Sequence, residues 1–571
     1  MDAKRIVLFV IFSTSLLFLW EAWINEQARF EQINAAADSD KTSQVDPDLP
    51  VPGDSLTETS SAGDSSQIPE NADARDMVTP RLLPTGEQIK VVTDMVIAEI
   101  DTVGGDLRRL ELRKHPSTED KNTPYALLQS QASRIYVAQS GLIGEELPNH
   151  KTVYRPESAK RQYEMTAGEN EITIRLLANE TNHVQVTKIY TFHRDSYVID
   201  VSFEIKNTGE NTLRPFAYYQ MLRDSTPPPS NTLMNHSYTG AAIYTEAEKF
   251  KKIPFSDMDS NSVDYPTNAD NGWIAMLEHY FLTAWLPEQG QPREFFAKRQ
   301  NENLYTTGVI LPVDEITPGS TRTSSIRLYA GPQEQDNLAK LAPGLEFTVD
   351  YGWLTIIAVP LFWLLSFYHS LVDNWGLAII LLTVTVKVLF FPLSAAGYRS
   401  MAKLRQVTPK LKRIQDQYKG DRQRMHQAMM DFYREEKINP LGGCLPILVQ
   451  APVFIALFWT LLAAVELRYA PFALWINDLS TPDPYYILPV LMGISMFMQT
   501  KLNPTPADPI QARVMQIMPV AFSVFFFFFP AGLVLYSLVS NVLSIAQQWQ
   551  ITRMYDKPAV SAGNTNKNKE K

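Results

Sequence analysis

The chain has 571 residues, a formal net charge of −10 and a pI of about 5.5. This length exceeds that of one ordinary domain, and the acidic balance excludes a globally basic nucleic-acid-binding protein. The single cysteine, Cys444, excludes an internal disulfide. Apolar residues are concentrated in 1–25 and 353–550, which indicates an integral membrane protein with a soluble part between its hydrophobic regions.

The N-terminal segment, residues 1–25, has the features of an uncleaved signal anchor. Lys4 and Arg5 precede an apolar run that ends near Trp23, and they place the N-terminus in the cytoplasm. The alternative is a cleaved signal peptide, but no small-residue cleavage pattern follows the run. Residues 26–87 follow; from 36 to 79 they contain no aromatic residue, which predicts a flexible periplasmic tether.

Residues 88–345 show the alternation of apolar and polar side chains that is typical of half-buried strands. In Tyr197–Gly209, for example, Val201, Phe203 and Ile205 alternate with polar residues. Similar runs occur at 91–100, 171–177, 184–193 and 306–311. The pattern predicts an all-β sandwich in the periplasm. The histidines His193, His236 and His279 lack metal-binding spacing, so we interpret them as structural or surface residues.

Six apolar segments follow, at 353–370, 375–393, 445–465, 485–500, 514–529 and 531–549. Between 398 and 437 there are 11 Lys or Arg against 5 Asp or Glu, and the positive-inside rule places this segment in the cytoplasm. Only one membrane span can then lie between the β domain and this cytoplasmic segment. We therefore predict an interfacial helix at 346–372 and an α-helical core of five spans at 373–556. Residues 26–372 would be periplasmic, with both termini cytoplasmic.

Two of the predicted spans are short, and one cytoplasmic segment is charged. Residues 485–500 and 514–529 have about sixteen residues each, fewer than the roughly 20 that cross a bilayer, which predicts local thinning. Residues 398–437 have helical spacing interrupted at Gly420, which predicts a basic helical hairpin. A solvated face is its default interpretation, and binding of ribosomal RNA or anionic lipid is the alternative. A short tail follows at 557–571.

Lys387 is a charged residue within the first predicted span. A central charge costs on the order of 2.5–3.5 kcal/mol on insertion scales, and the spans contain no Asp, Glu or His to pair with it. Snorkelling to an interface or capping of backbone carbonyls are the structural alternatives. The functional interpretation is a positive charge facing a water-filled cavity. Thr383 and Ser394 would share its face on one continuous helix.

Polar residues also repeat along other spans. Ser537, Asn541, Ser544 and Gln548 follow helical spacing on the last span beside Tyr536, Ser495 and Gln499 lie on the fourth, and Gln450 begins the third. Interhelical hydrogen bonding is the common explanation of each one. Together with Lys387, these stripes predict a hydrated groove. Its other side would be apolar, since the third and fifth spans carry Phe454, Phe458, Phe522 and Phe525.

Nucleotide-binding, esterase and zinc-protease motifs are absent, which predicts a protein that is not an enzyme and needs no cofactor or metal. A secondary transporter or channel is one alternative function, but it would usually show internal repeats and an acidic coupling residue. A membrane-anchored carbohydrate-binding or isomerase protein is the other, and sugar binding by an isolated 80–345 fragment would favour it.

Several stretches resemble the YidC family of bacterial membrane protein insertases. They are Asn439-Pro440-Leu441-Gly442-Gly443-Cys444, Ala470-Pro471-Phe472-Ala473-Leu474-Trp475-Ile476, Asp483-Pro484-Tyr485-Tyr486-Ile487-Leu488-Pro489 and Gly532-Leu533-Val534-Leu535-Tyr536. The order of parts is also similar to that of Gram-negative members, and the resemblance is most specific from 350 to 556. The β domain is similar to sugar-mutarotase sandwiches.

The resemblance implies an ATP-independent insertase and chaperone of the bacterial inner membrane, acting alone or with the Sec translocon. It implies a groove in which Lys387 attracts acidic parts of a substrate, lined by Thr383, Gln450 and Tyr536. The polar stripe on the last span adds Asn541 to this groove. Apolar substrate segments would slide along Phe454, Phe458, Phe522 and Phe525. The implied partners are nascent membrane proteins, the Sec translocon, phospholipid and, through the hairpin and basic tail, the ribosome. The family more often has arginine where this chain has Lys387; lysine, unlike arginine, can lose its proton when desolvated.

Overall fold

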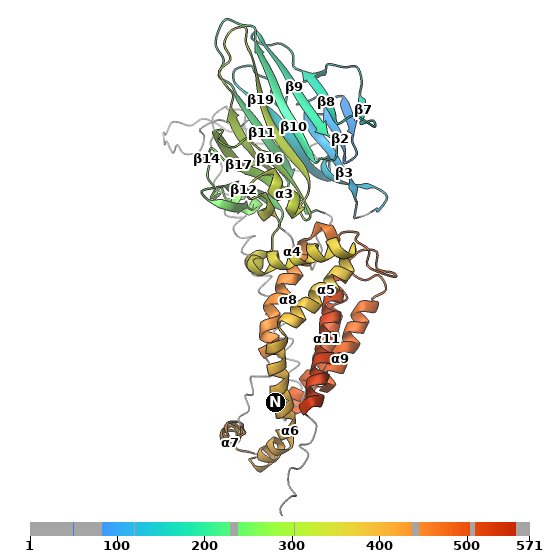
Figure 1. The fold of residues 1–571 in the computed structure, drawn as a ribbon. Helices are drawn as coiled ribbons and strands as arrows, with labels where there is room; N and C mark the ends of the chain where they lie inside the picture. The colour runs from blue at the N-terminus through green and yellow to red at the C-terminus, as the bar shows by residue number, and fades with distance from the viewer. Residues whose placement is uncertain are drawn as a thin grey trace, which may run out of the picture. The chain divides into compact units, whose positions relative to one another are not determined.

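The computed structural model describes residues 50, 83–118, 120–228, 238–301, 303–418, 420–436, 445–502 and 509–555. The predicted anchor at 1–25, most of the tether and the tail at 557–571 lie outside these residues. The chain divides into two compact units, with the boundary between residues 349 and 350. The first is made of strands and the second of helices (Figure 1).

The β unit is a sandwich of two sheets, as the sequence predicted. The first has ten strands in the order β14 (Asn268–Ala269), β17 (Arg293–Asn301), β18 (Leu304–Pro312), β11 (Phe216–Asp224), β5 (Arg134–Ile143), β4 (Pro124–Gln131), β3 (Asp106–Pro116), β2 (Val96–Asp101), β1 (Gln88–Val92) and β7 (Gln162–Glu164). The second has nine, in the order β13 (Lys249–Ile253), β12 (Gly240–Thr245), β15 (Trp273–Leu277), β16 (Phe281–Leu286), β19 (Thr321–Pro332), β10 (Val198–Asn207), β9 (Val184–His193), β8 (Glu171–Leu177) and β6 (Arg155–Pro156). Neighbours pair antiparallel except β1 and β7. Two short helices, α2 (Phe255–Asp259) and α3 (Gln335–Leu341), accompany the sheets.

The predicted alternation corresponds to real strands with one exception. Val201, Phe203 and Ile205 of β10 are fully buried. The run at 91–100, however, is a hairpin of β1 and β2 rather than one strand. The Thr93 hydroxyl accepts the backbone N–H groups of Met95 and Val96, at 3.1 and 3.0 Å, and this local hydrogen bonding turns the chain.

Charged side chains connect the two sheets through the core. Lys188 on β9 and Asp106 on β3 are both fully buried, with 3.9 Å between the ammonium and the carboxylate. The Lys188 ammonium also donates to the carbonyls of Gly104 and Ser140. Burial raises the pKa of Asp106 to about 6, although the nearby cations Lys188 and Arg108 act in the opposite direction. A carboxyl whose folded pKa exceeds its unfolded value binds a proton more tightly in the folded state.

We therefore expect Asp106 to reduce stability as pH rises from about 4 to about 6, by about 3 kcal/mol at most. Asp106→Asn should remove this contribution. The measurement is hydrogen exchange of β9 amides in the full-length chain, as the difference between wild type and variant at pH 4 and pH 6.5. An unchanged difference across this window would contradict the prediction.

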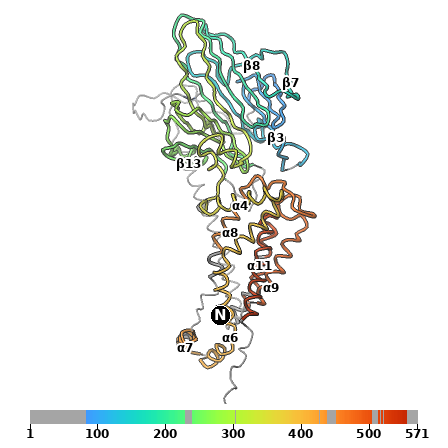
Figure 2. Tube along the Cα trace, in the orientation of Figure 1, coloured from blue at the N-terminus to red at the C-terminus, as the bar shows by residue number. Residues whose placement is uncertain are grey.

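The second unit is helical. Its helices are α4 (Thr355–Val372), α5 (Trp375–Leu389), α6 (Phe391–Gln417), α7 (Arg422–Glu435), α8 (Leu445–Ala463), α9 (Ile487–Leu502), α10 (Pro509–Phe525) and α11 (Ala531–Tyr555), with short 3-10 turns η1 (Leu345–Thr348, at the end of the β unit), η2 (Gly352–Leu354) and η4 (Val465–Leu467). Helix α11 packs against α5, α6, α8 and α9, and Figure 2 traces α9 and α11 beside each other. Helix α4 packs against α5 and α8 but runs across the direction of α8, α9 and α11 (Figure 1).

By length and composition, α4 is the one helix in the described part that could cross a membrane by itself. The pair α5 and α6 passes the same test as one segment, although it bends by 65°, and Gln450–Ala463 and Ile487–Leu502 are apolar but shorter. The count of five spans therefore stays a prediction. The length of α4 does not distinguish it from a membrane-spanning helix. Its direction does set α4 apart, because α4 runs across α8, α9 and α11 (Figure 1).

The bend between α5 and α6 corrects the expectation of one straight helix through 375–393. Pro392 lies in the first turn of α6, where its missing N–H costs nothing, whereas in one continuous helix its ring would clash with the carbonyl of Val388, four residues earlier. Helix α5 consequently ends at Leu389, and Lys387 lies in its last turn rather than at its centre. Ser394 belongs to α6, so it does not continue the α5 face of Thr383 and Lys387.

Helices α6 and α7 pack as a pair around Val407 and Leu411, which contact Met429 and Phe432. The Lys410 ammonium of α6 and the Glu436 carboxylate at the end of α7 lie 2.8 Å apart. The turn between the helices includes Gly420, whose φ of 110° belongs to the left-handed region that favours glycine.

Candidate functional site

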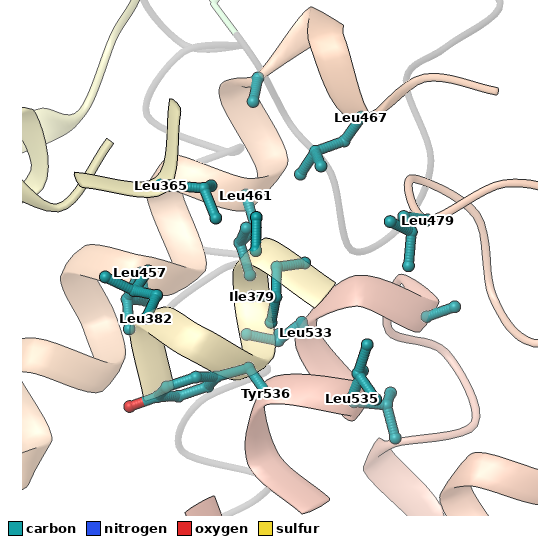
Figure 3. Packing of buried hydrophobic residues seen from close by; sticks show 14 of the residues in the cluster. Leu365, Ile379, Leu382, Leu457, Leu461, Leu467, Leu479, Leu533, Leu535 and Tyr536 are labelled. Atoms are coloured by element: carbon teal, nitrogen blue, oxygen red, sulfur yellow. The ribbon is translucent and has the colours of Figure 1, made fainter. Parts of the chain in front are cut away.

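The interior of the helical unit is apolar at one end. Buried side chains from α4, α5, α8, α11 and the 464–486 loop form a single cluster (Figure 3), which includes Leu365, Ile379, Leu382, Leu457, Leu461, Leu467, Leu479, Leu533 and Leu535. Tyr536 lies at the edge of this cluster, and Figure 3 shows its ring beside the leucines with the hydroxyl directed away from them.

The loop between α8 and α9 closes this apolar end with hydrogen bonds to three helix starts. The buried Asp483 carboxylate accepts the backbone N–H groups of Tyr485 and Leu488, which caps α9. The carbonyl of Leu479 accepts from Gly532 at the start of α11, at 2.9 Å. At the start of α5, the Asn374 amide donates to the Phe472 carbonyl. The loop is therefore a folded part of the bundle.

Beyond Tyr536 the interior becomes polar. The Lys387 ammonium from α5 donates to the Ser544 hydroxyl of α11 at 2.7 Å and to the Gln450 side-chain carbonyl of α8 at 3.4 Å. The Gln450 amide in turn donates to the Tyr536 hydroxyl at 3.0 Å. Three helices thus meet at this ammonium. The residue that carries it, Lys387, is buried and only 9% exposed.

The remaining polar positions connect α11 to α9. The Asn541 amide donates to the Ser495 hydroxyl at 2.8 Å, and the Gln548 amide donates to the Leu502 carbonyl at 3.4 Å. Ser537 donates instead to Leu533 of its own helix. Most of the stripe on α11 therefore serves interhelical hydrogen bonding, the common role of such residues.

The predicted groove residues divide into three groups in space. Lys387, Gln450 and Tyr536 form one network, and Asn541 bonds separately to α9. Thr383 is buried, with its hydroxyl donating to the Ile379 carbonyl of its own helix. Ser544, the nearest partner of Lys387, was predicted as part of the polar stripe on the last span but was not singled out as a residue that lines the groove.

The predicted apolar side is partly assembled. Phe454 and Phe458 are half-buried against the apolar cluster, where Phe454 lies 6.2 Å from Tyr536 between ring centroids. Phe458 packs edge-on against Phe529 at 5.6 Å. Phe525 is 57% exposed on the surface. Phe522 lies in α10, and its side chain is outside the described part of the structure.

Lys387 has no ionic partner within the described helices, where both of its hydrogen-bond acceptors are neutral oxygens. No group of three or more potential metal ligands occurs among the described residues. The site can therefore offer a positive charge and hydrogen-bond donors.

A β-sandwich followed in the chain by apolar helices around a buried lysine is typical of a membrane-associated protein with a large extramembrane domain. The family model for the YidC periplasmic domain matches residues 88–364, and that for the 60Kd inner membrane protein matches 367–558. The chain belongs to the YidC family, as the sequence motifs indicated. Membership makes it an inner-membrane protein whose β unit is the periplasmic domain.

Individual relatives agree with this assignment over nearly the whole chain. A protein of Nitrosomonas eutropha named membrane protein insertase YidC is 71% identical over 562 residues, which cover 97% of this chain and 90% of that protein. One of Nitrosospira multiformis with the same name is 61% identical over 580 residues and covers both chains fully.

Among solved structures, an active YidC insertase with its first transmembrane domain resolved covers 81% of this chain and 93% of its own, with a TM-score of 0.39 and 18% identity. A putative aldose 1-epimerase from Escherichia coli K12 covers 43% of this chain and 99% of its own, with a TM-score of 0.26 and 10% identity.

Proposed function

We propose that this protein inserts and helps to fold integral membrane proteins in the bacterial inner membrane, without chemical catalysis. The observation that carries the proposal is the Lys387 ammonium, which lies where three helices meet. Within the described helices, its hydrogen-bond acceptors are neutral oxygens. A buried cation without a fixed anion is costly in hydrocarbon, and such residues usually serve function. A carboxylate in the polar tail of a substrate supplies the missing partner.

The change from apolar to polar interior supports a groove that is closed at the periplasmic end and hydrated at the cytoplasmic end. A polar tail that crosses ~30 Å of hydrocarbon pays a large desolvation penalty. A hydrated half-path around Lys387, Gln450 and Asn541 shortens the dry distance. The substrate's apolar segment then moves into lipid past Phe454, Phe458, Phe522 and Phe525, and its burial supplies the driving free energy.

Short helices support a thinned bilayer beside this groove. Helix α9 has 16 residues, which corresponds to about 24 Å of helix and is less than the ~30 Å of hydrocarbon. Helix α10 has 17 residues and includes Arg513, which shortens its apolar part further. Local thinning reduces the barrier for the substrate tail.

In the proposed topology, α4 lies on the periplasmic membrane surface and five helices, α5, α8, α9, α10 and α11, span the membrane. One face of α4 is apolar and exposed; it carries Ile356, Val359, Trp363, Phe367 and Leu371 at helical spacing. Such a face suits a helix that is partly immersed in lipid. The α6–α7 hairpin and both termini are cytoplasmic, where the basic hairpin and tail contact the ribosome, and the core cooperates with the Sec translocon.

Reconstitution tests the proposed function directly. The full-length chain in liposomes should insert a small single-span substrate with an acidic outer tail, without nucleotide and well above protein-free liposomes. Protease protection of the translocated tail measures insertion. Equal protection with and without the protein would contradict the insertase function.

A further inference from the structure

The contact between Lys387 and Ser544 joins two buried side chains from different helices. The ammonium of Lys387 donates to the Ser544 oxygen at 2.7 Å, and both side chains are less than a tenth exposed. Lys387 is two residues from the end of α5, so its long, flexible side chain could otherwise turn toward the bend at Phe390. The position of the ammonium therefore depends on what holds it.

Both acceptor oxygens are oriented by a second hydrogen bond. The Ser544 hydroxyl donates its one hydrogen to the Ser540 carbonyl at 2.9 Å, which leaves its lone pairs for Lys387 and for the Tyr398 side chain, its other hydrogen-bond partner. The Gln450 amide nitrogen donates to Tyr536 at 3.0 Å, which turns the Gln450 carbonyl oxygen toward Lys387. Neither oxygen has to reorient to accept from the ammonium, so the arrangement is pre-organised.

An ammonium has three N–H donors. Within the described helices, Ser544 and Gln450 take two of those of Lys387. The third remains for an acceptor from outside the bundle. Since neutral oxygens do not cancel the charge, a carboxylate oxygen is the acceptor that gains most from this donor.

We propose that Ser544 is a positioning residue for substrate recognition: together with Gln450 it fixes the Lys387 ammonium so that its third N–H meets a carboxylate in the substrate's polar tail. This inference rests on the proposed function and adds the residue that positions the charge for the substrate's carboxylate. Without the Ser544 hydroxyl, the lysine side chain regains rotamers that move the charge out of the bundle, and recognition of acidic tails weakens.

The test compares two substrates that differ in charge alone, one with aspartates in its outer tail and one with asparagines in their place. Full-length variants in liposomes are scored by the ratio of insertion of the acidic substrate to that of the neutral one. Ser544→Ala should lower this ratio about fivefold, which corresponds to the loss of one ordinary hydrogen bond while Gln450 still holds the ammonium. Ser544→Thr, which keeps the hydroxyl, should retain the wild-type ratio.

Thr460→Ala is the matched control. It also removes a buried hydroxyl from a core helix, but Thr460 donates to Ala456 of its own helix and is not part of the Lys387 network. This variant should keep the wild-type ratio. A wild-type ratio in Ser544→Ala, or an equal loss with both substrates, would overturn the positioning role.

Lys387→Gln separates this inference from the function on which it rests. If wild type inserts both substrates and Lys387→Gln leaves the ratio unchanged, the charge has no role and the positioning of Ser544 fails with it. If wild type inserts neither substrate, the insertase function itself fails.

Discussion

Lys387→Glu should reduce insertion of substrates with acidic outer tails at least tenfold. The substitution replaces attraction by repulsion, and two unit charges about 4 Å apart interact by about 4 kcal/mol at an effective dielectric constant of 20. The new carboxylate would also face the Ser544 and Gln450 oxygens, which are oriented as acceptors. Lys387→Arg, which keeps the positive charge, should preserve insertion.

Protease protection in liposomes gives the initial rate for each variant, and asparagine-tailed substrates provide the control for electrostatics. With these neutral tails, Lys387→Glu should lose much less activity. The role of charge is wrong if Lys387→Glu inserts acidic tails at the wild-type rate, or if it loses both classes of substrate equally.

Glu278→Gln should lower the free energy of unfolding of the β domain by about 3–5 kcal/mol. Glu278 lies between β15 and β16 of one sheet and is fully buried, and it pairs with Arg134 and Arg223 from β5 and β11 of the other sheet. It also accepts the Tyr125 hydroxyl at 2.9 Å. Burial alone would raise the pKa of Glu278, but the two guanidinium groups outweigh it and hold this pKa below its usual value.

The glutamine variant leaves two buried guanidinium groups without an anion, which explains the large expected effect. Hydrogen exchange of β15 and β16 amides in the full-length chain measures it. Arg134→Met combined with Glu278→Gln should recover part of the loss. The control is Glu315→Gln, because the Glu315–Arg214 pair is exposed and should contribute less than about 1 kcal/mol. Equal effects at Glu278 and Glu315 would contradict the prediction.

The pairing of charges inside the sandwich shows where strand patterns are insufficient. In β9, the alternation that buries Val186 and Tyr190 also directs Lys188 inward, so the strand pattern held a signal for a buried lysine that was not among the predictions. Its partner Asp106 could not be found in the same way, because Asp106 lies on another sheet and about eighty residues earlier in the chain. Register within one strand is local, whereas contacts between sheets depend on how the sheets pack.

The sequence by itself determined the class of the protein, its division into a β-sandwich and an apolar helical part, and its family. It also led to the prediction that Lys387 is a functional residue. Composition, alternation and motifs are local properties, so they can be read before folding. The tertiary structure decided which polar residues contact one another. The break after Leu389 has a local cause, Pro392, but the tertiary structure alone placed Ser544 rather than Thr383 against the Lys387 ammonium. Contacts of this kind depend on the rotation and crossing of three separate helices, which no spacing within one helix specifies.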